Sequence, residues 1–528
     1  MKLSQQSSVI IFLCLSLAVA YILTTAHFHE QHAVDGGLVL AKKVVYPDNF
    51  SPLKDYFLGA WTSIHQISAL LFKFNWSVLN VSKFFIFIIS LFYMIGTSSV
   101  IYSFTRSAMV SFLTLLFIVI FQKNFGDADY PTLFFSPHTF GALSLAITTS
   151  IFGLAFMGYF FLVGFLSTLL ISVHPVIGVW ICFIIFSSVI FMKFALKKEL
   201  NTKKLIYGAI AGLFISFVSF FVYLNEGYFA SSNINFEALN NYMKYWEGHR
   251  NETKFHFEYL LKTLGLFIFS IYCLIKLKKK INNNIVLGVT IVLANIFFSS
   301  IIFITYKFID FPTLIKLIMP TRFVIMHSVI AWPIILAILF LLIKEFCEQK
   351  KIATYIAHIT IILILSLYTI QHYKGLISLK NYYVKNLKYE KSLSKKDSFW
   401  NVVNDAELKG YVLTTGSSSV ATLRKGFKPI LFNPYVIDFT PYFPKTALRL
   451  SIIIEKIYGI SFVEPPTKLR NRASISDEFI KLNFEKYSKD KWKSLAKKYN
   501  ISALVVPENW NINLPFLTKN NKFAFYIF

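Results

Sequence analysis

The segment KFALKKELNTKK (193–204) places five lysines between two long apolar runs. Two similar segments follow, KLKKK (276–280) and KEFCEQKK (344–351), and each is separated from the one before by two apolar runs. Short loops rich in Lys and Arg remain in the cytoplasm. We therefore expect all three segments on one side of a membrane. One more apolar run, 353–370, follows the last of them, so residues 371–528 are predicted to lie outside the cytoplasm.

The composition also indicates a membrane protein. Of the 528 residues, 55% are hydrophobic and 15% charged, whereas soluble domains carry about 25% charged residues. The net charge of +26 does not indicate a nucleic-acid partner, because much of it lies in the three Lys-rich segments and in 371–528. That last region holds 26 Lys and Arg against 12 Asp and Glu. A basic outer domain near a bilayer suits anionic head groups or phosphate-bearing lipids.

The expected fold is mainly α, a polytopic transmembrane helix bundle over 1–370 with a small extracytoplasmic α/β domain over 371–528. An outer loop, 27–56, and an amphipathic surface helix, 57–74, are expected after the first span. Apolar runs near 20 residues predict about 11 spans. They are 7–26, 82–104, 107–122, 205–224, 258–276, 283–306, 322–344, 353–370 and three within 139–192.

The count of spans depends on the uncharged stretch 139–192, which as a helix measures roughly 80 Å. We expect three short spans, with breaks near Met157-Gly158 and at His174-Pro175. Three spans place the N-terminus in the cytoplasm, whereas two spans would place the N-terminus outside and the first loop inside. The first apolar run is long for a signal peptide, which favours an uncleaved span, although a cleavable signal stays an alternative.

The region after 371 alternates between strand and helix patterns, which indicates a small sheet covered by helices. All four cysteines lie in or beside predicted spans, so no disulfide framework is expected in this region. Helices are predicted at 385–408, 445–458 and 488–500, and strands at 411–416, 428–433, 503–508 and 522–528.

The first outer loop, HFHEQHAVDGGLVLAKKVVYPDNF (27–50), carries the strongest candidates for chemistry. A carboxylate such as Glu30 or Asp35, held just above a bilayer, can act as a general base or bind a hydroxyl-rich substrate. The sequence Asp35-Gly36-Gly37 indicates a turn that presents the carboxylate from a loop. Two other interpretations stay open. The three histidines and Glu30 can form a metal site, or the loop is polar because it is solvated.

Five basic residues are candidates for binding phosphate. Arg322 opens a predicted span on the outer side, where a helix N-terminus adds positive charge. His249 and Arg250 follow interfacial aromatic residues, His138 precedes another helix start, and His174 is polar at membrane depth. Each site has a simpler alternative. Arg322 can extend to lipid head groups, and the aromatic residues before His249 and Arg250 can form an interfacial belt. His174 can lie at a helix turn at the membrane interface.

This layout resembles the type-C glycosyltransferase (GT-C) superfamily, whose members have an acidic first outer loop, a surface helix after it and an outer C-terminal domain. The matching parts are Glu30 and Asp35 in HFHEQHAVDGG, the segment 57–74 and the region 371–528. The resemblance implies that Asp35 is the base, with Glu30 as its substitute, and Arg322 in IMPTR looks like the arginine that opens a late span. The chain departs from the family because it lacks a W-W-D-x-G motif and its two acids are five residues apart.

The resemblance implies an integral membrane enzyme at the outer face of a bacterial inner membrane. It would transfer a sugar from a polyprenyl-phosphate-linked donor. The bilayer and this lipid-linked sugar are the expected partners, without nucleic acid. No cofactor is expected, although a divalent metal stays an option. The alternatives are a transporter of lipid-linked sugar, a surface-glycan polymerase or ligase, and a non-enzymatic envelope assembly protein.

Overall fold

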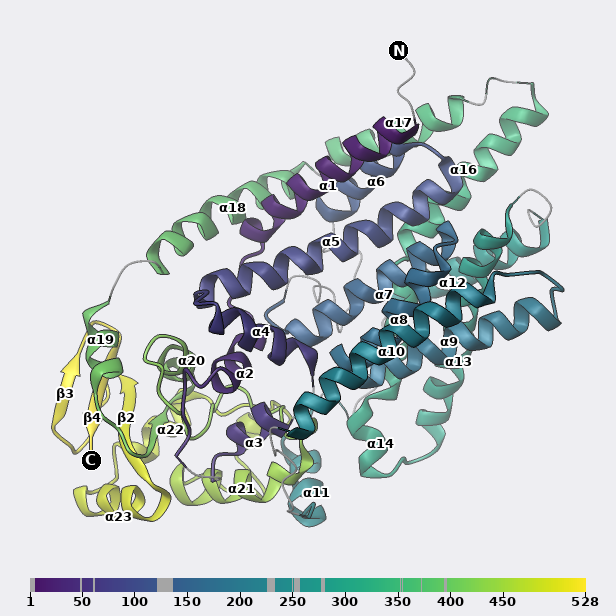
Figure 1. Ribbon diagram of the computed structural model, residues 1–528. Coiled ribbons are helices and arrows are strands. Elements are labelled where there is room, and N and C mark those ends of the chain that lie inside the picture. The colour runs from purple at the N-terminus through teal and green to yellow at the C-terminus, as the bar shows by residue number, and fades with distance from the viewer. Residues whose placement is uncertain are drawn as a thin grey trace.

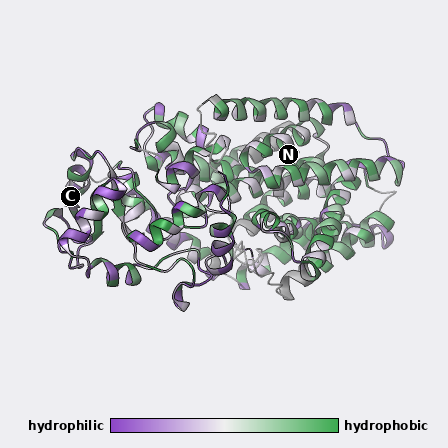
Figure 2. Cartoon of the chain, turned by 90° about the horizontal axis from the view of Figure 1, so that it is seen from below, coloured by the Kyte–Doolittle hydropathy of each residue, from purple (hydrophilic) through white to green (hydrophobic). Residues whose placement is uncertain are grey.

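The computed structural model describes residues 5–47, 50–59, 62–120, 136–225, 233–248, 250, 257–276, 281–351, 353, 355–371, 373–393 and 397–528. Long helices form a bundle, and a small sheet lies in the C-terminal part of the chain (Figure 1). Hydrophobic residues dominate the bundle, and hydrophilic residues are more frequent in the C-terminal part (Figure 2). This arrangement confirms the expected mainly α class with a small C-terminal sheet.

The helices of the bundle follow the predicted apolar runs closely. Among the described residues, α5, α7, α9, α10 and α13 are long and apolar enough to cross a bilayer, or six spans if α17 and α18 together form one bent span. The number of eleven spans stays a prediction. The bundle helices are α1 (Gln5–Ala26), α5 (Val78–Thr105), α6 (Ala108–Ile120), α7 (Thr139–Met157), α8 (Phe160–Val173), α9 (Pro175–Phe194), α10 (Thr202–Asn225), α12 (Phe257–Lys276), α13 (Asn283–Phe308), α16 (Ala331–Gln349) and α17 (Tyr355–Gln371).

Both predicted breaks in the uncharged stretch are present. Gly158 ends α7 with a φ of 81°, a left-handed conformation that glycine adopts without steric cost. Pro175 stands at the first position of α9, where its missing N–H costs no helical hydrogen bond. The stretch therefore forms three helices, of which α8 has only 14 residues.

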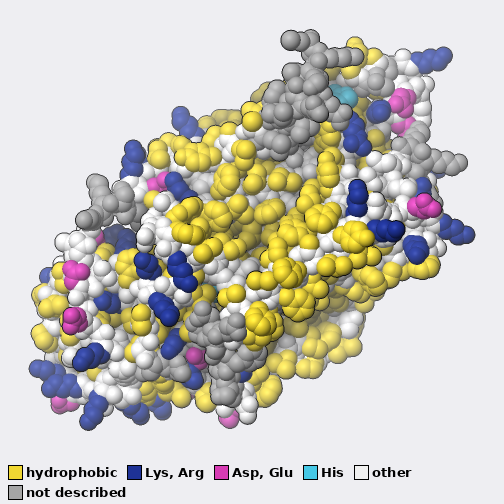
Figure 3. Space-filling model, in the orientation of Figure 1, with side chains coloured by type: hydrophobic (Ala, Val, Ile, Leu, Met, Phe, Trp, Pro, Cys, Tyr) yellow, Lys and Arg dark blue, Asp and Glu magenta, His cyan; other side chains and the backbone are white. Residues whose placement is uncertain are grey.

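The surface of the bundle is suited to lipid. Hydrophobic side chains cover a broad area of it, and Lys and Arg gather beyond that area at opposite ends of the molecule (Figure 3). Phe186 of α9, Phe214 of α10 and Ile275 of α12 are 65%, 68% and 69% exposed. Apolar surface of this extent is rare on soluble monomers and marks contact with a membrane or a partner.

Short helices occupy the segments that connect the long ones. They are α2 (Ala33–Leu40), α3 (Pro52–Gly59), α4 (Ser63–Lys73), α11 (Phe236–Tyr245), α14 (Thr313–Ile318), the 3-10 turn η3 (Pro320–Val324) and α15 (Ile325–Ser328). The expectation of one surface helix over 57–74 is wrong, because α3 ends at Gly59 and a new helix begins after Thr62. The Thr62 hydroxyl accepts a hydrogen bond from the Ile64 amide and so caps α4.

The expected turn at Asp35-Gly36-Gly37 is also wrong, since these residues lie in α2. The two glycines serve close packing of α2 against α4. A Cβ on Gly36 would lie 2.4 Å from the ring of His65, and one on Gly37 would lie 2.3 Å from Cβ of Ser68. Sequence alone cannot distinguish this use of glycine from its use in turns.

The span expected over 322–344 begins later than predicted. Residues 320–324 form η3, α15 follows, and the long helix α16 begins only at Ala331. The side-chain amide of Asn295 in α13 donates to the carbonyl of Phe323 at 3.2 Å. This hydrogen bond engages a carbonyl that a continuous helix would use internally.

The C-terminal part follows a long helix, α18 (Lys374–Leu393), which runs beside α1 (Figure 1). Its sheet has the strand order β1-β2-β4-β3, with β1 parallel to β2 and the other pairs antiparallel. The elements are α19 (Ser398–Asp405), β1 (Tyr411–Thr414), α20 (Gly416–Arg424), η4 (Pro444–Thr446), α21 (Ala447–Ile452), the π-turn η5 (Ile453–Ile457), η6 (Thr467–Leu469), α22 (Asp477–Phe484), α23 (Lys489–Tyr499), β2 (Ile501–Pro507), β3 (Phe516–Lys519) and β4 (Phe523–Ile527).

Three of the four predicted strands are present, and the strand expected over 428–433 is not. That segment forms one isolated bridge, between Ile430 and Val412. Pro429 has no N–H to donate to a neighbouring strand, which limits pairing. The helix predicted over 385–408 divides into the end of α18 and α19, and α20, α22 and β3 were not predicted.

We predict that Gly37→Ala destabilises the protein, because the added methyl would collide with Ser68 in the α2–α4 contact. Overpacking of this kind costs about 1–3 kcal/mol. The thermal midpoint of the purified full chain in detergent should fall. Gly265→Ala in α12 is the matched control, since its Cβ would meet nothing within 4 Å. Equal midpoints for the two variants would contradict the packing role of Gly37.

Candidate functional site

The connection between α1 and α2, residues 27–32, is held by buried hydrogen bonds. The Gln31 amide donates to Oγ of Ser82 at 3.1 Å, and the Thr139 hydroxyl donates to Oε1 of Gln31 at 3.0 Å. The His32 amide donates to the carbonyl of Pro137 at 3.0 Å. These bonds fix the connection to α5 and to the start of α7, so Glu30 and Asp35 have defined positions.

Arg424 of the C-terminal part reaches both predicted acids. Its Nε and Nη2 donate to the two oxygens of Asp35 at 2.6 and 3.0 Å, and Nη1 donates to Oε2 of Glu30 at 3.0 Å. Nη2 also donates to the carbonyl of Gln31 at 3.3 Å. The Arg424 side chain is 3% exposed, and each carboxylate is 15% exposed. We call Glu30, Asp35 and Arg424 the carboxylate cluster.

Local sequence explains how Arg424 arrives there. The helix α20 begins with a capping box, in which the Thr415 amide donates to Oγ of Ser418 at 3.0 Å. Asp477 accepts hydrogen bonds from the Gly416 and Ser417 amides at 2.8 and 3.3 Å and favours the positive end of the helix. Arg424 lies in the last turn of α20, which packs against α2 (Figure 1).

The carboxylate cluster has one positive and two negative groups, so a net negative charge remains when all three are ionised. Burial raises the pKa of Asp35, and the charge and hydrogen bonds of Arg424 oppose that rise. The nearby charge of Glu30 raises the pKa of Asp35 further. The cluster can therefore take up a proton more readily than an isolated Asp–Arg pair.

Two histidines lie beside the carboxylate cluster. The rings of His32 and His138 meet edge to face, with centroids 4.6 Å apart. Burial lowers the pKa of His32 to about 3, and the positive charges of His138 and Arg424 act in the same direction. His32 is therefore neutral near pH 7. Of the predicted phosphate-binding residues, His138 is placed by this contact next to His32, two residues after Glu30 in the chain.

A second ionic contact joins the same parts of the chain. Arg449 of α21 pairs with Asp55 of α3. Nearby, the buried Ser51 donates its hydroxyl to the carbonyl of Leu431 at 2.9 Å, and the Ser51 amide donates to the hydroxyl of Tyr411 at 3.2 Å. The C-terminal part is therefore attached to both α2 and α3.

Arg250 is already paired. Its Nη1 donates to Oε2 of the buried Glu247 at 2.5 Å, and its guanidinium lies 5.4 Å from the ring centroid of Tyr442. The Tyr442 ring lies 6.4 Å from Tyr56, which in turn lies 6.4 Å from His65 beside α2. Aromatic rings thus stand between Arg250 and α2. A phosphate-binding role for Arg250 stays a prediction.

The other predicted basic residues lie elsewhere. His249 is outside the described residues. His174 caps α9, and its Nδ1 accepts from the Ile177 amide at 3.5 Å. The backbone of Arg322 lies in η3. A buried polar network that includes Asn295 of α13 contacts η3 at the carbonyl of Phe323. In that network Asn295 contacts Nδ1 of His327 at 2.9 Å and accepts from the Trp180 indole at 2.8 Å.

Three important residues were missed at the level of sequence. Arg424 and Arg449 lie in a region where helices were either not predicted or not assigned a role. The signal for α20 was present, namely Thr415 followed three residues later by Ser418, with Gly426 after the last turn. His65 was counted only as part of a surface helix, yet it is 1% exposed and packs 5.0 Å from Phe140.

The described residues contain no group of three or more His, Cys, Asp and Glu side chains arranged to hold a metal ion. The histidines of the first loop therefore do not gather with Glu30 into such a group.

We predict that Arg424→Ala strongly destabilises attachment of the C-terminal part. Removing one partner of a buried ion pair costs about 3–5 kcal/mol, because the remaining charges are left uncompensated. Limited proteolysis and thermal melting of the full chain should report the loss. Lys425→Ala, which removes an exposed neighbouring charge, is the control. The triple variant E30Q/D35N/R424M should recover much of the loss, and a triple variant as unstable as Arg424→Ala would contradict this explanation.

We predict a stability loss in acid that depends on His65. Burial lowers the pKa of His65 from 6.5 to about 3. Between these values the unfolded chain takes up a proton that the folded protein excludes. The stabilisation is thus complete above pH 6.5 and falls by about 1.4 kcal/mol per pH unit below it. The drop in thermal midpoint from pH 7.5 to 4.5 should be smaller for His65→Leu than for the wild type, and equal drops would exclude His65.

This chain resembles a known protein in structure rather than in sequence. No protein-family model matches it, and no curated protein matches it. A solved structure that resembles it is the crystal structure of the Archaeoglobus fulgidus oligosaccharyltransferase in the apo form. That match has a TM-score of 0.42 and 8% sequence identity, and it covers 94% of this chain and 69% of the other.

Proposed function

We propose that this protein is a membrane glycosyltransferase that moves a sugar from a polyprenyl-phosphate-linked donor to an acceptor at the outer face of the membrane. The observation that supports this most is the convergence of Glu30 and Asp35 on Arg424, where the apolar bundle meets the C-terminal part. Both carboxylates retain some exposure, and the apolar helix α1 ends four residues before Glu30. A lipid-linked head group would lie at this level.

We assign the role of general base to Glu30. Arg424 engages both oxygens of Asp35 but only Oε2 of Glu30. Oε1 of Glu30 is therefore the better placed atom for accepting a proton from an acceptor hydroxyl. Asp35 would instead orient Arg424. This assignment reverses the order suggested by the family resemblance, in which Asp35 was the base and Glu30 the substitute.

The proposed reaction needs no redox step. The acceptor oxygen attacks C1 of the donor sugar, and its proton passes to Glu30. The bond between C1 and the phosphate oxygen breaks, and that oxygen keeps the electron pair, so lipid phosphate leaves as an anion. In a partly buried site, fixed charges act strongly on developing charge. Arg424 would moderate the negative charge of the two carboxylates so that an anionic donor can approach.

The proposed setting follows from the distribution of Lys. The cytoplasmic side would carry the Lys-rich segments 193–204, 276–280 and 344–351, with the N-terminus on the same side. The carboxylate cluster and region 371–528 would then face outward, as in the inner membrane of a bacterium. This orientation remains a proposal that reporter fusions can examine.

One observation favours a second candidate function, that of a non-enzymatic envelope assembly protein. Arg424 makes four hydrogen bonds within the chain, as expected of a purely structural contact. In that case the carboxylates would only attach the C-terminal part. The two functions predict different effects of replacing Glu30. In an assembly protein the replacement removes one hydrogen bond from the contact with Arg424, whereas in an enzyme it removes the atom that accepts the proton.

The test uses the purified full chain in lipid nanodiscs with a panel of radiolabelled polyprenyl-phosphate sugars, and it measures the release of polyprenyl phosphate. We predict that Glu30→Gln lowers kcat by roughly 10²–10⁴-fold, the range for loss of a general base, while the thermal midpoint changes little.

Glu407→Gln, at an exposed position of the C-terminal part, is the matched control and should keep full activity. Unchanged kcat in Glu30→Gln would exclude Glu30 as the base. If Asp35→Asn abolished release without unfolding and Glu30→Gln did not, the base would be Asp35. Absence of release by the wild type with every donor of the panel would favour the assembly function.

A further inference from the structure

The connection between α13 and η3 exposes large apolar side chains. Helix α14 lies within it, and none of the six residues of this helix is buried. Leu314, Ile315 and Ile318 of α14 are 45%, 38% and 45% exposed. Before the helix, Ile309 is 54% exposed, and Phe308, the last residue of α13, is 83% exposed. We call these five residues the α14 patch.

The α14 patch continues one exposed face of α13. Exposed apolar residues follow one another along this helix at intervals of four, three and four residues, at Phe297, Ile301, Ile304 and Phe308. This spacing places them on the same side of the helix. Helix α13 is long and apolar enough to cross a bilayer. Since Phe308 belongs to both surfaces, the apolar face of a span-length helix leads directly into the α14 patch.

The other side of α14 is attached to α11 and to the C-terminal part (Figure 1). Leu317 packs against a small buried cluster that joins α11 to α21, formed by Ala238, Leu239 and Ala447. The Thr313 hydroxyl donates to Oδ1 of Asn240 in α11 at 2.8 Å. Nε of Arg250 donates to the carbonyl of Leu317 at 3.4 Å. Helix α14 therefore has one side packed on the protein and another side free.

Groups typical of a membrane boundary lie beside the α14 patch. Lys316 pairs with Asp310 at 2.5 Å, and the Asp310 side chain is 90% exposed. The Tyr306 ring lies 5.3 Å from the ring of Phe311, and the Tyr306 hydroxyl donates to the carbonyl of Arg250 at 2.8 Å. Tyrosines with a bonded polar tip and lysines with apolar stems are frequent where acyl chains meet head groups.

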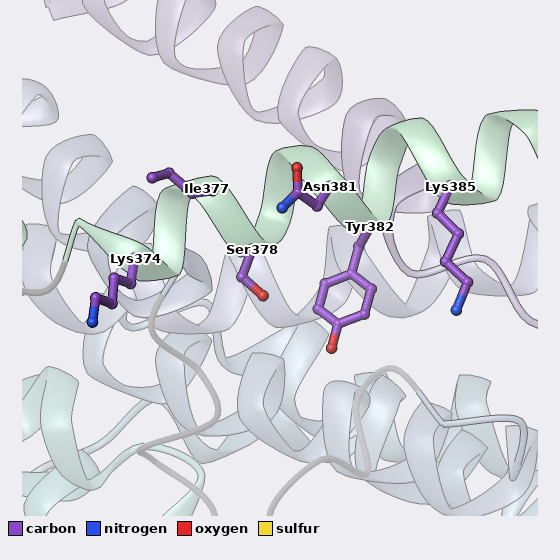
Figure 4. A pocket seen from close by; sticks show the side chains of 6 residues that line it. All are labelled: Lys374, Ile377, Ser378, Asn381, Tyr382 and Lys385. Carbon is purple, nitrogen blue, oxygen red and sulfur yellow. The ribbon is translucent and has the colours of Figure 1, made fainter.

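Another surface helix, α18, presents a different kind of face. A groove of about 360 Å³ runs along it (Figure 4). The groove is lined by Lys374, Ile377, Ser378, Asn381, Tyr382 and Lys385. Five of these six side chains carry an ammonium, hydroxyl or amide group, as suits contact with water. In α14, by contrast, every exposed residue is Leu or Ile.

We propose that the α14 patch inserts into the bilayer at the boundary between acyl chains and head groups, and that α14 thereby anchors the C-terminal part to the membrane surface. The occupant is lipid, because the patch is continuous with the lipid-facing side of α13. Interfacial helices bury their apolar face about 5–10 Å into this boundary. The packed side of α14 passes the anchorage to α21 through α11. The inference does not depend on glycosyl transfer.

Photo-cross-linking identifies what covers the α14 patch. In the full chain, p-benzoylphenylalanine replaces Ile315, and the protein is reconstituted in nanodiscs of phosphatidylcholine. Mass spectrometry after irradiation should find a lipid adduct whose fragments place the new bond on an acyl chain. The yield should be comparable with that of the same probe at Phe214 of α10, a residue of the exposed bundle surface. Thermal midpoints check that both proteins remain folded.

Val402 of α19 is the matched control position for the probe. It is 39% exposed, close to the 38% of Ile315, but it belongs to the C-terminal part. The probe at Val402 should give no lipid adduct. The cross-link replaces a single exposed residue, so it decides the insertion without any further variant.

Hydrogen exchange tests the anchorage. In nanodiscs, the triple variant L314N/I315N/I318N should increase amide exchange in α11 and α21 several-fold, because local opening becomes easier when the lipid contact is lost. Leu482→Asn, which replaces an exposed apolar residue of α22, is the control and should leave exchange in α11 unchanged.

Three results would overturn the inference. The first is no lipid adduct at Ile315 in a sample where Phe214 gives one. The second is a cross-link from Ile315 to a second copy of the chain or to another protein, which would assign the α14 patch to a protein interface. The third is unchanged exchange in α11 and α21 of the triple variant, which would reject the anchoring role.

Discussion

The buried contact of Arg424 with Asp35 and Glu30 is the constraint on which the rest of the candidate site depends. It joins residues 389 and 394 positions apart, and it decides where the C-terminal part sits on the bundle. Charges removed from water lose hydration energy, so such a contact adds less to stability than its geometry suggests. Its main effect is specificity, because an alternative position would leave an arginine or two carboxylates buried without a partner.

The same contact places opposite demands on the two acids. Asp35 gives both oxygens to Arg424 and gains a fixed orientation, whereas Glu30 gives one. A carboxylate held through one oxygen can be oriented and still accept a proton through the other. His32 adds no charge near pH 7, because burial lowers its pKa to about 3. Glu30, Asp35 and Arg424 are thus the charged groups that contact one another in the cluster.

Hydropathy predicted the bundle helices well because an apolar run must remain helical wherever lipid or protein surrounds it. The breaks at Gly158 and Pro175 were also predicted, because the backbone properties of glycine and proline act locally. The helix α2 was misread because Gly36 and Gly37 satisfy both a turn and a close helix contact. The start of α16 was missed because the hydrogen bond that engages Phe323 comes from Asn295 in a distant helix.

The candidate site also combines residues that the sequence pointed to with residues that only the structure revealed. That Glu30 and Asp35 are notable was evident from the sequence, because they lie in a polar loop directly after the first apolar run. Arg424, Arg449 and His65 were not predicted, since nothing local in their sequence reveals the partner that each one meets.

By itself, the sequence determined which segments are apolar, that most of them form helices, and which loop carries acids. These properties depend on neighbours along the chain. Only the tertiary structure decided that Arg424 lies between the acids, and that Arg250 is already paired with Glu247. The reason is physical: the charge state and accessibility of a side chain depend on what surrounds it in space, and the partners of Arg424 are hundreds of residues away along the chain.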